Sequence, residues 1–538
     1  MPEMIQGEEL APGWEAGSFG DEQSVTVRSM RPRRVIGLGL LLVLGLLLRL
    51  YHLGSQSVWI DEAHSLRLAA LGPMEIIEKT MQENHPPLYF LALSAWMKFW
   101  PETEAVARLF SALLGTAFIA IFYRFCREIL PGATSLLASA FLALSPWAVW
   151  HSQDARMYPL ALVFSYLAFV LFFAYLRNGS LLRLAGFILV LLASLFTHFY
   201  AISIIPVLLI YLGWVRRALD PGRLHRMTGA IFLAGLCWMP WVVVILSVVK
   251  AAGFYKPITV LSLPYVLYAF SVGYTLGPSP AELRPLVKAA SIPLHHLPLV
   301  ATVALLFGTL LIRGLWELSR GAKGRRFFVL LLLAVPLLLP IAVTLVHHPI
   351  DFNARYGFIA FPAYLIVLAT GLLSIRGRKA RSVLGAGVLA LMGWSLYSHY
   401  TDSQYGKEDA RAAFRLVNAT QAPGDCVLVI GIAWAYQYYE EYYEGTPVHS
   451  RWLDFRSPGR LQATEAALQE WRQSCQTLWL VSGRDWEEDP MGLAVPMLEK
   501  WFSPVEETIL TGVRVVRFER SDVGRSDITK SLVAPKHY

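Results

Sequence analysis

A series of long apolar runs between residues 35 and 398 constrains the fold more than any other feature of this chain. Each run approaches the roughly 20 residues that an α-helix needs to cross the hydrocarbon core of a bilayer. The composition agrees, because 55% hydrophobic and 16% charged residues exclude a soluble, disordered or disulfide-stapled chain. We therefore expect an all-α polytopic membrane protein with about eleven spanning helices. The expected spans lie near residues 35–53, 104–126, 132–150, 157–176, 183–199, 200–215, 228–249, 296–318, 327–346, 356–374 and 382–398.

Charge divides the chain into two parts. Residues 400–538 hold 15 basic against 20 acidic residues, a net charge of −5, whereas the preceding part holds 32 against 19, a net charge of +13. The basic residues gather in alternate loops, and the positive-inside rule places such loops in the cytoplasm. The first run follows three arginines and lies too deep in the chain for a cleaved signal peptide, so we expect an uncleaved anchor and a cytoplasmic N-terminus. This topology predicts a multi-pass inner (plasma) membrane protein with an extracytoplasmic C-terminal part. The positive charge is explained by membrane topology, so no nucleic-acid partner is expected.

The long apolar runs end before residue 400, and the pattern of the sequence changes after it. Strand-like runs at 426–430, 477–481 and 513–518 and a helix-like run at 461–475 predict a small α/β domain. Cys426 and Cys475 both lie in this part and can pair there if it faces an oxidising space. The expected divisions are a mobile cytoplasmic tail (1–34), a transmembrane domain (35–400), an extracytoplasmic α/β domain (401–520) and a C-terminal tail (521–538).

The first outer loop, residues 54–103, is long and contains several titratable residues. Two segments, 59–72 and 86–100, are apolar at helical spacing, and the second ends in tryptophans that favour the membrane surface. We expect interfacial helices there.

Titratable residues concentrate on this same face of the predicted membrane protein. Asp61 and Glu62 follow the first span, where they can supply a general base and a partner that orients the acceptor, or simply form a solvated pair. His85 precedes two prolines, a pattern more typical of a helix start than of a ligand.

Two later segments carry polar pairs. Asp154 and Arg156 lie where the third span ends and Tyr158 begins the fourth, so they either share a polar cavity or anchor a helix end. Arg355 and Tyr356 precede a late span, where Arg355 can hold a phosphate with its planar fork or snorkel to the membrane surface.

Three further candidates are isolated polar groups near span ends. Arg108 lies at the depth of a lipid phosphate, although a lone arginine there can also snorkel. His198 is individually more typical of a structural residue. His347 and His348 suggest a metal, but adjacent histidines point in different directions and no further ligands accompany them, so we expect no metal site there.

Taken in order, these motifs resemble a known family. Asp-Glu in the first outer loop is followed by His-Pro-Pro-Leu, Arg-Leu-Phe-Ser-Ala-Leu-Leu-Gly, Ser-Gln-Asp-Ala-Arg-Met-Tyr, and Arg-Tyr before a late span. This series, which covers roughly residues 35–400, resembles the GT-C glycosyltransferases. It is most similar to bacterial members of glycosyltransferase family 39, related to protein O-mannosyltransferases and to the aminoarabinose transferase of lipid A. The resemblance implies inverting transfer of a sugar from a polyprenyl-phosphate donor to a hydroxyl of a protein or glycolipid acceptor.

The resemblance also implies roles for individual residues. Asp61 matches the catalytic aspartate, and Glu62 matches its acidic neighbour, which helps to hold the substrates. His85 falls near the donor phosphate, Arg108 matches an arginine that opens the following span, and Asp154 matches an acidic position that shapes the sugar site.

The remaining expected residues line the donor site. These are Arg156, Tyr158, His198, Arg355 and Tyr356.

A lipid monophosphate bears less charge than a nucleotide diphosphate, and the outer loop has no Asp-x-Asp pair. We therefore expect transfer without a metal or other cofactor. A transporter or flippase of lipid-linked sugars is the alternative, but such proteins usually place polar sites near the midplane and show repeated halves.

Overall fold

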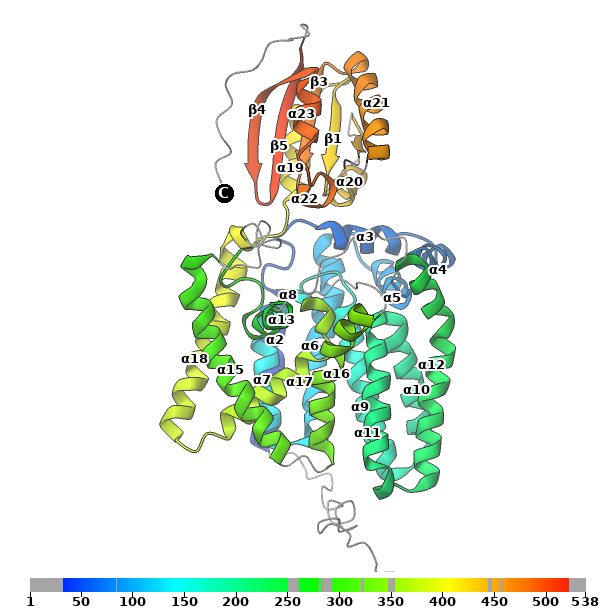
Figure 1. Ribbon diagram of the computed structural model, residues 1–538, viewed down its shortest axis with the longest axis vertical. Helices are drawn as coiled ribbons and strands as arrows, with labels where there is room; N and C mark the ends of the chain where they lie inside the picture. Colours follow the sequence, from blue (N-terminus) through cyan, green and yellow to red (C-terminus); the bar gives the residue numbers. More distant parts are fainter. Residues whose placement is uncertain are drawn as a thin grey trace, which may run out of the picture.

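The computed structural model is a helical bundle that carries a small sheet domain at one end (Figure 1). It describes residues 32–83, 85–249, 261–279, 282, 293–320, 324–346, 354–443, 448–453, 455 and 458–521. The expected N-terminal tail up to residue 31, the pair His347 and His348, and most of the expected C-terminal tail lie outside these residues.

The bundle is built almost entirely of helices. In chain order they are α2 (Pro32–Leu50), α6 (Glu104–Ile129), α7 (Gly132–Leu144), α8 (Pro146–Ser152), α9 (Tyr158–Asn178), α10 (Leu181–Thr197), η2 (Phe199–Ser203), α11 (Ile204–Val215), η3 (Arg216–Ala218), α12 (Pro221–Val249), α13 (Ser262–Val272), η4 (Leu294–His296), α15 (Leu297–Arg320), α16 (Arg325–Val346), η5 (Ala354–Gly357), α17 (Phe361–Leu373) and α18 (Arg378–Thr401).

Within the described part of the chain, six helices are long and apolar enough to cross a membrane. The pair α7 and α8, bent by 56° at Ser145, raises this number to seven if it forms one span. Other expected spans fall on shorter apolar helices, among them α10 and α17. A helical multi-pass membrane protein is thus confirmed, and the total of about eleven spans stays a prediction.

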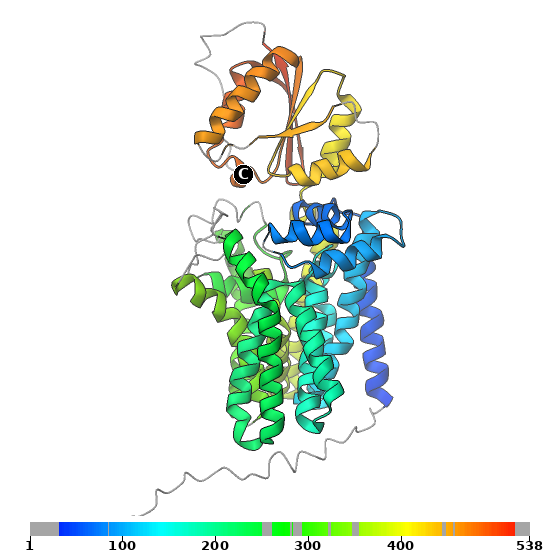
Figure 2. The same cartoon turned by 90° about the vertical axis from the view of Figure 1, so that its right-hand side faces the viewer.

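Three short helices of the first outer loop lie across the end of the bundle, directly beneath the sheet domain (Figure 2). They are α3 (Ile60–Ala69), α4 (Pro73–Met81) and α5 (Leu88–Met97). Helices α3 and α5 match the two expected interfacial segments, whereas α4 lies between them. The indole of Trp96 donates a hydrogen bond to the backbone oxygen of Val106 at 2.9 Å and so ties the end of α5 to α6.

The C-terminal domain is a five-stranded sheet flanked by helices. Its strand order is β2-β1-β3-β5-β4, in which β2, β1 and β3 run parallel while β5 is antiparallel to both β3 and β4. The three expected strands are present, and the structure adds β2 and β4. The elements are η6 (Ser403–Tyr405), α19 (Ala410–Thr420), β1 (Cys426–Ile430), α20 (Ala433–Tyr442), β2 (Ser450–Trp452), α21 (Pro458–Ser474), β3 (Thr477–Ser482), α22 (Asp485–Glu488), α23 (Ala494–Glu499), β4 (Phe502–Leu510) and β5 (Val513–Arg520).

Alternate residues of each strand face opposite sides of this sheet. Val427 and Val429 share one core cluster with Phe414 of α19, whereas Leu428 packs with Trp471 of α21 on the other side. A disulfide joins Cys426 to Cys475, with a Cα–Cα distance of 5.8 Å, so the pairing that the sequence allowed is present.

Hydrogen bonds and a stacking contact between two rings join the sheet domain to the bundle. The hydroxyl of Tyr439 in α20 accepts a hydrogen bond from the backbone N–H of Val58 at 2.8 Å and donates one to Glu104 at 2.6 Å. The ring of Trp434 stacks on His64 of α3, with 5.0 Å between centroids. The domain therefore lies directly over the first outer loop.

Candidate active site

A buried ion pair between Glu62 and Arg108 forms the base of the candidate site. Nε and Nη2 of Arg108 donate to the two oxygens of Glu62 at 2.8 and 2.7 Å, a bidentate arrangement. The other three N–H groups of Arg108 reach the backbone oxygens of Leu53, Gln56 and Ser57. All five donors are thus occupied, and the side chain is only 2% exposed. This geometry disagrees with the expectation that Arg108 binds the donor phosphate, because no donor is left for a ligand.

A second cation, Lys407, joins Glu62 to Asp154. Its Nζ atom lies 3.1 Å from Oε2 of Glu62 and also pairs with Oδ1 of Asp154. The backbone N–H of Ala155 donates to the other Glu62 oxygen at 2.9 Å. Burial and the nearby charge of Glu62 raise the pKa of Asp154 in spite of Lys407. Two almost fully buried carboxylates are therefore held together by two cations.

Asp61, unlike its neighbour Glu62, remains partly accessible. Its side chain is 26% exposed, and Oδ2 accepts a hydrogen bond from Nη1 of Arg355 at 2.7 Å. The guanidinium of Arg355 also lies 5.8 Å from the ring centre of Trp59 and 5.4 Å from that of Tyr356. Burial opposes ionisation of Asp61, but the charges of Arg355 and Arg156 outweigh it and hold the pKa of this carboxyl well below its usual value. Asp61 is thus an ionised and partly exposed carboxylate.

Arg156 fixes the backbone at Asp61. Its Nη1 donates to the backbone oxygen of Asp61 and to Oγ of Ser65, both at 2.9 Å. Its Nε is buried and has no partner among the described residues. His85 lies nearby with an unpartnered Nδ1, and burial together with the charge of Arg156 lowers the pKa of this imidazole well below its usual value. Unpartnered polar atoms next to Asp61 are the kind of groups that a polar ligand satisfies.

Aromatic rings pack against one another beside these polar groups. Tyr158 and His198 are 5.5 Å apart between ring centres, and both pack on Phe358. Tyr356 stacks on Tyr200 with 4.7 Å between centroids. Nε2 of His198 has no partner among the described residues. An apolar wall with a few polar atoms is typical of a small-molecule site.

The structure therefore brings the expected residues together, in two layers. Asp61, Arg355, His85 and Tyr356 are partly exposed, whereas Glu62, Arg108 and Asp154 form the buried base, and Arg156, Tyr158 and His198 are buried beside them. In the described part of the chain, the one group with metal-ligand spacing is Glu282 with His295 and His296, and it includes none of these site residues. The expectation of metal-independent transfer stays a prediction.

Two functional candidates were missed in the sequence. Lys407 belongs to the segment between α18 and α19, which reads as a linker because it follows the last apolar run. Arg484 follows β3 in the left-handed region, at φ 52°, an uncommon conformation for a residue other than glycine. Its charge contributes to the lowered pKa of Asp61. The only signal for either was a basic residue in the acidic C-terminal part of the chain.

Comparisons with known proteins show which solved structures this chain resembles. No family model and no curated protein matches the sequence. ArnT from Cupriavidus metallidurans, solved in the apo state and bound to undecaprenyl phosphate, matches in both forms with a TM-score of 0.51 and 12% identity over 89% of this chain and 97% of that chain. The Archaeoglobus fulgidus oligosaccharyltransferase in the apo form matches with a TM-score of 0.51 and 14% identity over 92% of this chain and 75% of that chain.

At identities this low, the structural matches establish the fold alone. Membership of glycosyltransferase family 39 stays a prediction. The architecture expected from the ordered motifs is nevertheless present over nearly the whole chain. The chain has the fold of the GT-C membrane glycosyltransferases.

Proposed function

We propose that this protein transfers a sugar from a polyprenyl-phosphate donor to a hydroxyl group of an acceptor, with inversion at the anomeric carbon and Asp61 as the general base. The observation that carries the proposal is the pair of Asp61 and Arg355, an accessible carboxylate held 2.7 Å from a guanidinium at the end of a membrane bundle. A base for the acceptor and a cation for the departing phosphate are the two groups that this reaction needs. The fold shared with ArnT, which was solved bound to undecaprenyl phosphate, supports a polyprenyl-phosphate donor.

The ion pair also suggests how the base is activated. In this geometry Arg355 stabilises the ionised form of Asp61 and so makes it a weak base. A donor phosphate competes for the planar guanidinium, because phosphate and carboxylate bind it in the same bidentate manner. When Arg355 turns to the phosphate, the pKa of Asp61 rises toward that of a base able to accept a proton.

Asp61 accepts the proton in the transfer step, and Arg355 is the main cation for the leaving phosphate. The acceptor oxygen gives its proton to Asp61 and forms a bond to the anomeric carbon. The bond between that carbon and the phosphate oxygen breaks on the opposite face, which inverts the configuration. The lipid phosphate leaves with the electron pair, and Arg355 stabilises its charge together with the free Nε of Arg156.

The buried base of the site has a positioning role in this proposal. Glu62 and Asp154 hold the first turn of α3 against the segment at 154–156 through Ala155 and Lys407. Because Arg108 has all five donors engaged, it positions Glu62 and takes no part in phosphate binding. We place the site on the extracytoplasmic face of the inner membrane, where the disulfide of the sheet domain is stable.

The experiment is transfer of radiolabelled sugars from a panel of synthetic polyprenyl phosphates by the purified protein in nanodiscs. Membrane extract supplies protein and glycolipid acceptors, and each reaction is run with and without a chelator. We expect wild-type transfer that survives the chelator and falls at least about 100-fold in Asp61→Asn, as expected for loss of a general base. Asp220→Asn is the matched control, because Asp220 is an exposed helix cap before α12.

The proposal fails if Asp61→Asn transfers as well as the wild type does. It also fails if the protein moves lipid-linked sugars across a vesicle membrane but transfers none from a donor that it binds, because that result identifies a flippase.

A further inference from the structure

Glu282, His295 and His296 form a cluster outside the candidate active site, at the start of α15. Nε2 of His295 lies 3.1 Å from Oε1 of Glu282, and Nε2 of His296 lies 3.2 Å from each oxygen of the same carboxylate. Each of the three groups offers one ligand atom, and these atoms all lie within 4.8 Å of one another. Two imidazoles and one carboxylate thus face a common point.

The spacing of these atoms fits a tetrahedral metal ion. Zn²⁺ binds imidazole nitrogen and carboxylate oxygen at roughly 2.0–2.2 Å, so neighbouring ligand atoms lie about 3.4 Å apart around it. The separations of 3.1 and 3.2 Å between the ring nitrogens and the carboxylate need to widen only slightly to admit such an ion. Hydrogen bonds alone give similar separations, so the surroundings of the three groups decide between the two arrangements.

The carboxylate of Glu282 is held in place by a residue that is not itself a ligand. The backbone N–H and the hydroxyl of Ser279 donate to Oε2 at 2.8 and 2.9 Å, and Ser279 is buried. Oε1 is left to face the two ring nitrogens. Carboxylates that bind metals are commonly fixed by outer hydrogen bonds of this kind.

The two histidines are adjacent in the chain, and their rings nevertheless meet at one carboxylate. They lie in the 3-10 turn η4, where their ring centres are 4.0 Å apart. Glu282 and His296 are 31% and 18% exposed and His295 is 66% exposed, so an ion can enter from solvent and keep a water ligand. Two nitrogen ligands favour Zn²⁺ over Mg²⁺ and Ca²⁺, which prefer oxygen.

We propose that Glu282, His295 and His296 bind one divalent ion of the Zn²⁺ class, with water in the fourth position. The ion links two points of the chain that lie 13 residues apart, one after α13 and one at the start of α15. Its role is structural. Its binding does not depend on the proposed transfer reaction, because none of the three ligands belongs to the candidate active site.

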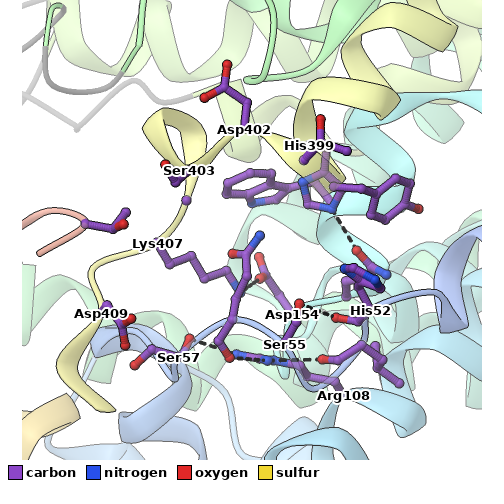
Figure 3. Close-up of a pocket in the computed structure, with 18 residues that line it drawn as sticks. His52, Ser55, Ser57, Arg108, Asp154, His399, Asp402, Ser403, Lys407 and Asp409 are labelled. Atoms are coloured by element: carbon purple, nitrogen blue, oxygen red, sulfur yellow. Dashed lines mark hydrogen bonds and ion pairs between the residues drawn. The ribbon is translucent and has the colours of Figure 1, made fainter. Parts of the chain in front are cut away.

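The metal site borders the segment that carries Lys407. The hydroxyl of Tyr405 donates to the backbone oxygen of Gly277 at 2.6 Å, and Ser279, two residues later, holds Glu282. Figure 3 shows Lys407 extending from this segment toward the buried base of the active site. An ion that fixes Glu282 to the start of α15 therefore restrains the backbone to which this segment is bonded.

The test is metal binding by the full-length protein in nanodiscs, purified without a polyhistidine tag and stripped with a chelator. Zn²⁺ retained after equilibration at micromolar concentration is counted by mass spectrometry, and Co²⁺ is titrated as a visible-light probe of coordination. We expect about one Zn²⁺ per chain, and Co²⁺ absorption bands of a four-coordinate ion that Zn²⁺ displaces.

Variants of the cluster identify the ligands. Glu282→Gln and His296→Ala should each weaken Zn²⁺ binding at least about tenfold, and Ser279→Ala should weaken it by about tenfold through loss of an outer hydrogen bond. The matched control is His347→Gln/His348→Gln, which replaces the other adjacent histidine pair of the chain and should leave binding unchanged. If one ligand variant does not fold, the other decides the matter, because both side chains are partly exposed.

The proposal is overturned if the wild type retains no more Zn²⁺ than Glu282→Gln does, or if Co²⁺ keeps the weak spectrum of the hydrated ion. It is also overturned if only His347→Gln/His348→Gln loses the ion. These outcomes are separable from failure of the proposed function. Asp61-dependent transfer by a protein that binds no Zn²⁺ refutes the metal site alone, whereas Zn²⁺ binding that requires Glu282 supports the site even in a protein that transfers no sugar.

Discussion

Replacement of Lys407 by methionine tests how the two buried carboxylates are held. Lys407 is 8% exposed and pairs with Glu62 and Asp154, which are 1% and 2% exposed. In Lys407→Met, Arg108 still neutralises Glu62, but Asp154 loses its cation. An ordinary aspartic acid titrates near pH 3.9, so holding Asp154 protonated at pH 7 costs up to about 4 kcal/mol. This agrees with the roughly 3–5 kcal/mol observed when one partner of a buried pair is removed.

The same reasoning fixes the direction of the pH dependence. The pKa of Asp154 is already raised in the folded protein, and loss of Lys407 raises it further. A group whose pKa is raised on folding stabilises the fold below its unfolded-state pKa and loses that contribution as the pH rises. The destabilisation by Lys407→Met should therefore shrink from at most about 4 kcal/mol at pH 7 to at most about 1.5 kcal/mol at pH 5.

The assay is denaturant unfolding of the purified protein, followed by tryptophan fluorescence at both pH values. The double variant Lys407→Met/Asp154→Asn should recover most of the lost stability, because the asparagine carries no charge. Lys500→Met is the control: Lys500 pairs with Glu465 on the surface, where a pair is worth about 1 kcal/mol or less. A loss below 1 kcal/mol in Lys407→Met, a loss independent of pH, or a double variant no more stable than the single one would refute the reasoning.

Four further predictions address the site and the sheet domain. Asp61→Asn should lose stability at pH 7, because a carboxyl whose pKa is lowered on folding stabilises the fold when ionised, and this loss should shrink as the pH falls below about 4; a loss independent of pH would show that the charges of Arg355 and Arg156 do not stabilise Asp61. Glu62→Gln should lose about 3–5 kcal/mol in the same unfolding assay, and near-wild-type stability would contradict the buried bidentate pair. Arg355→Met removes a charge that lowers the pKa of Asp61, so the acid limb of the pH–rate profile should move to higher pH. An unmoved limb would show that Arg355 does not control the pKa of the catalytic base. Replacing Cys426 and Cys475 by serine opens a loop of 49 residues and should cost about 4 kcal/mol, measured as the shift in unfolding of the oxidised protein, whereas an unchanged midpoint would show that the bond adds nothing.

Local pattern was enough to predict much of this molecule. The apolar runs predict the helical bundle because a membrane leaves the backbone few alternatives. Asp61 and Glu62 stand out because charged pairs directly after a span are uncommon. The resemblance of the ordered motifs assigned Asp61 and Arg355 to one site, but their ion pair, across 294 residues, was not predicted.

Other features depend on tertiary contacts that no local pattern encodes. The role of Arg108 is set by the backbone oxygens of Leu53, Gln56 and Ser57, and the sequence does not reveal where these oxygens point. Lys407 lies 345 residues from Glu62 in a segment with the composition of a linker. Neither assignment was accessible without the fold.

The position of Lys407 has a consequence for biogenesis. The ribosome makes Asp61 and Glu62 early and Lys407 only after every helix of the bundle, from α2 to α18, has been synthesised. Until that segment has been made and packs against the bundle, the two carboxylates of the buried base lack one of their two cations. The site is therefore completed last, after the bundle around it has been made, and a chain that stalls in the membrane cannot assemble it.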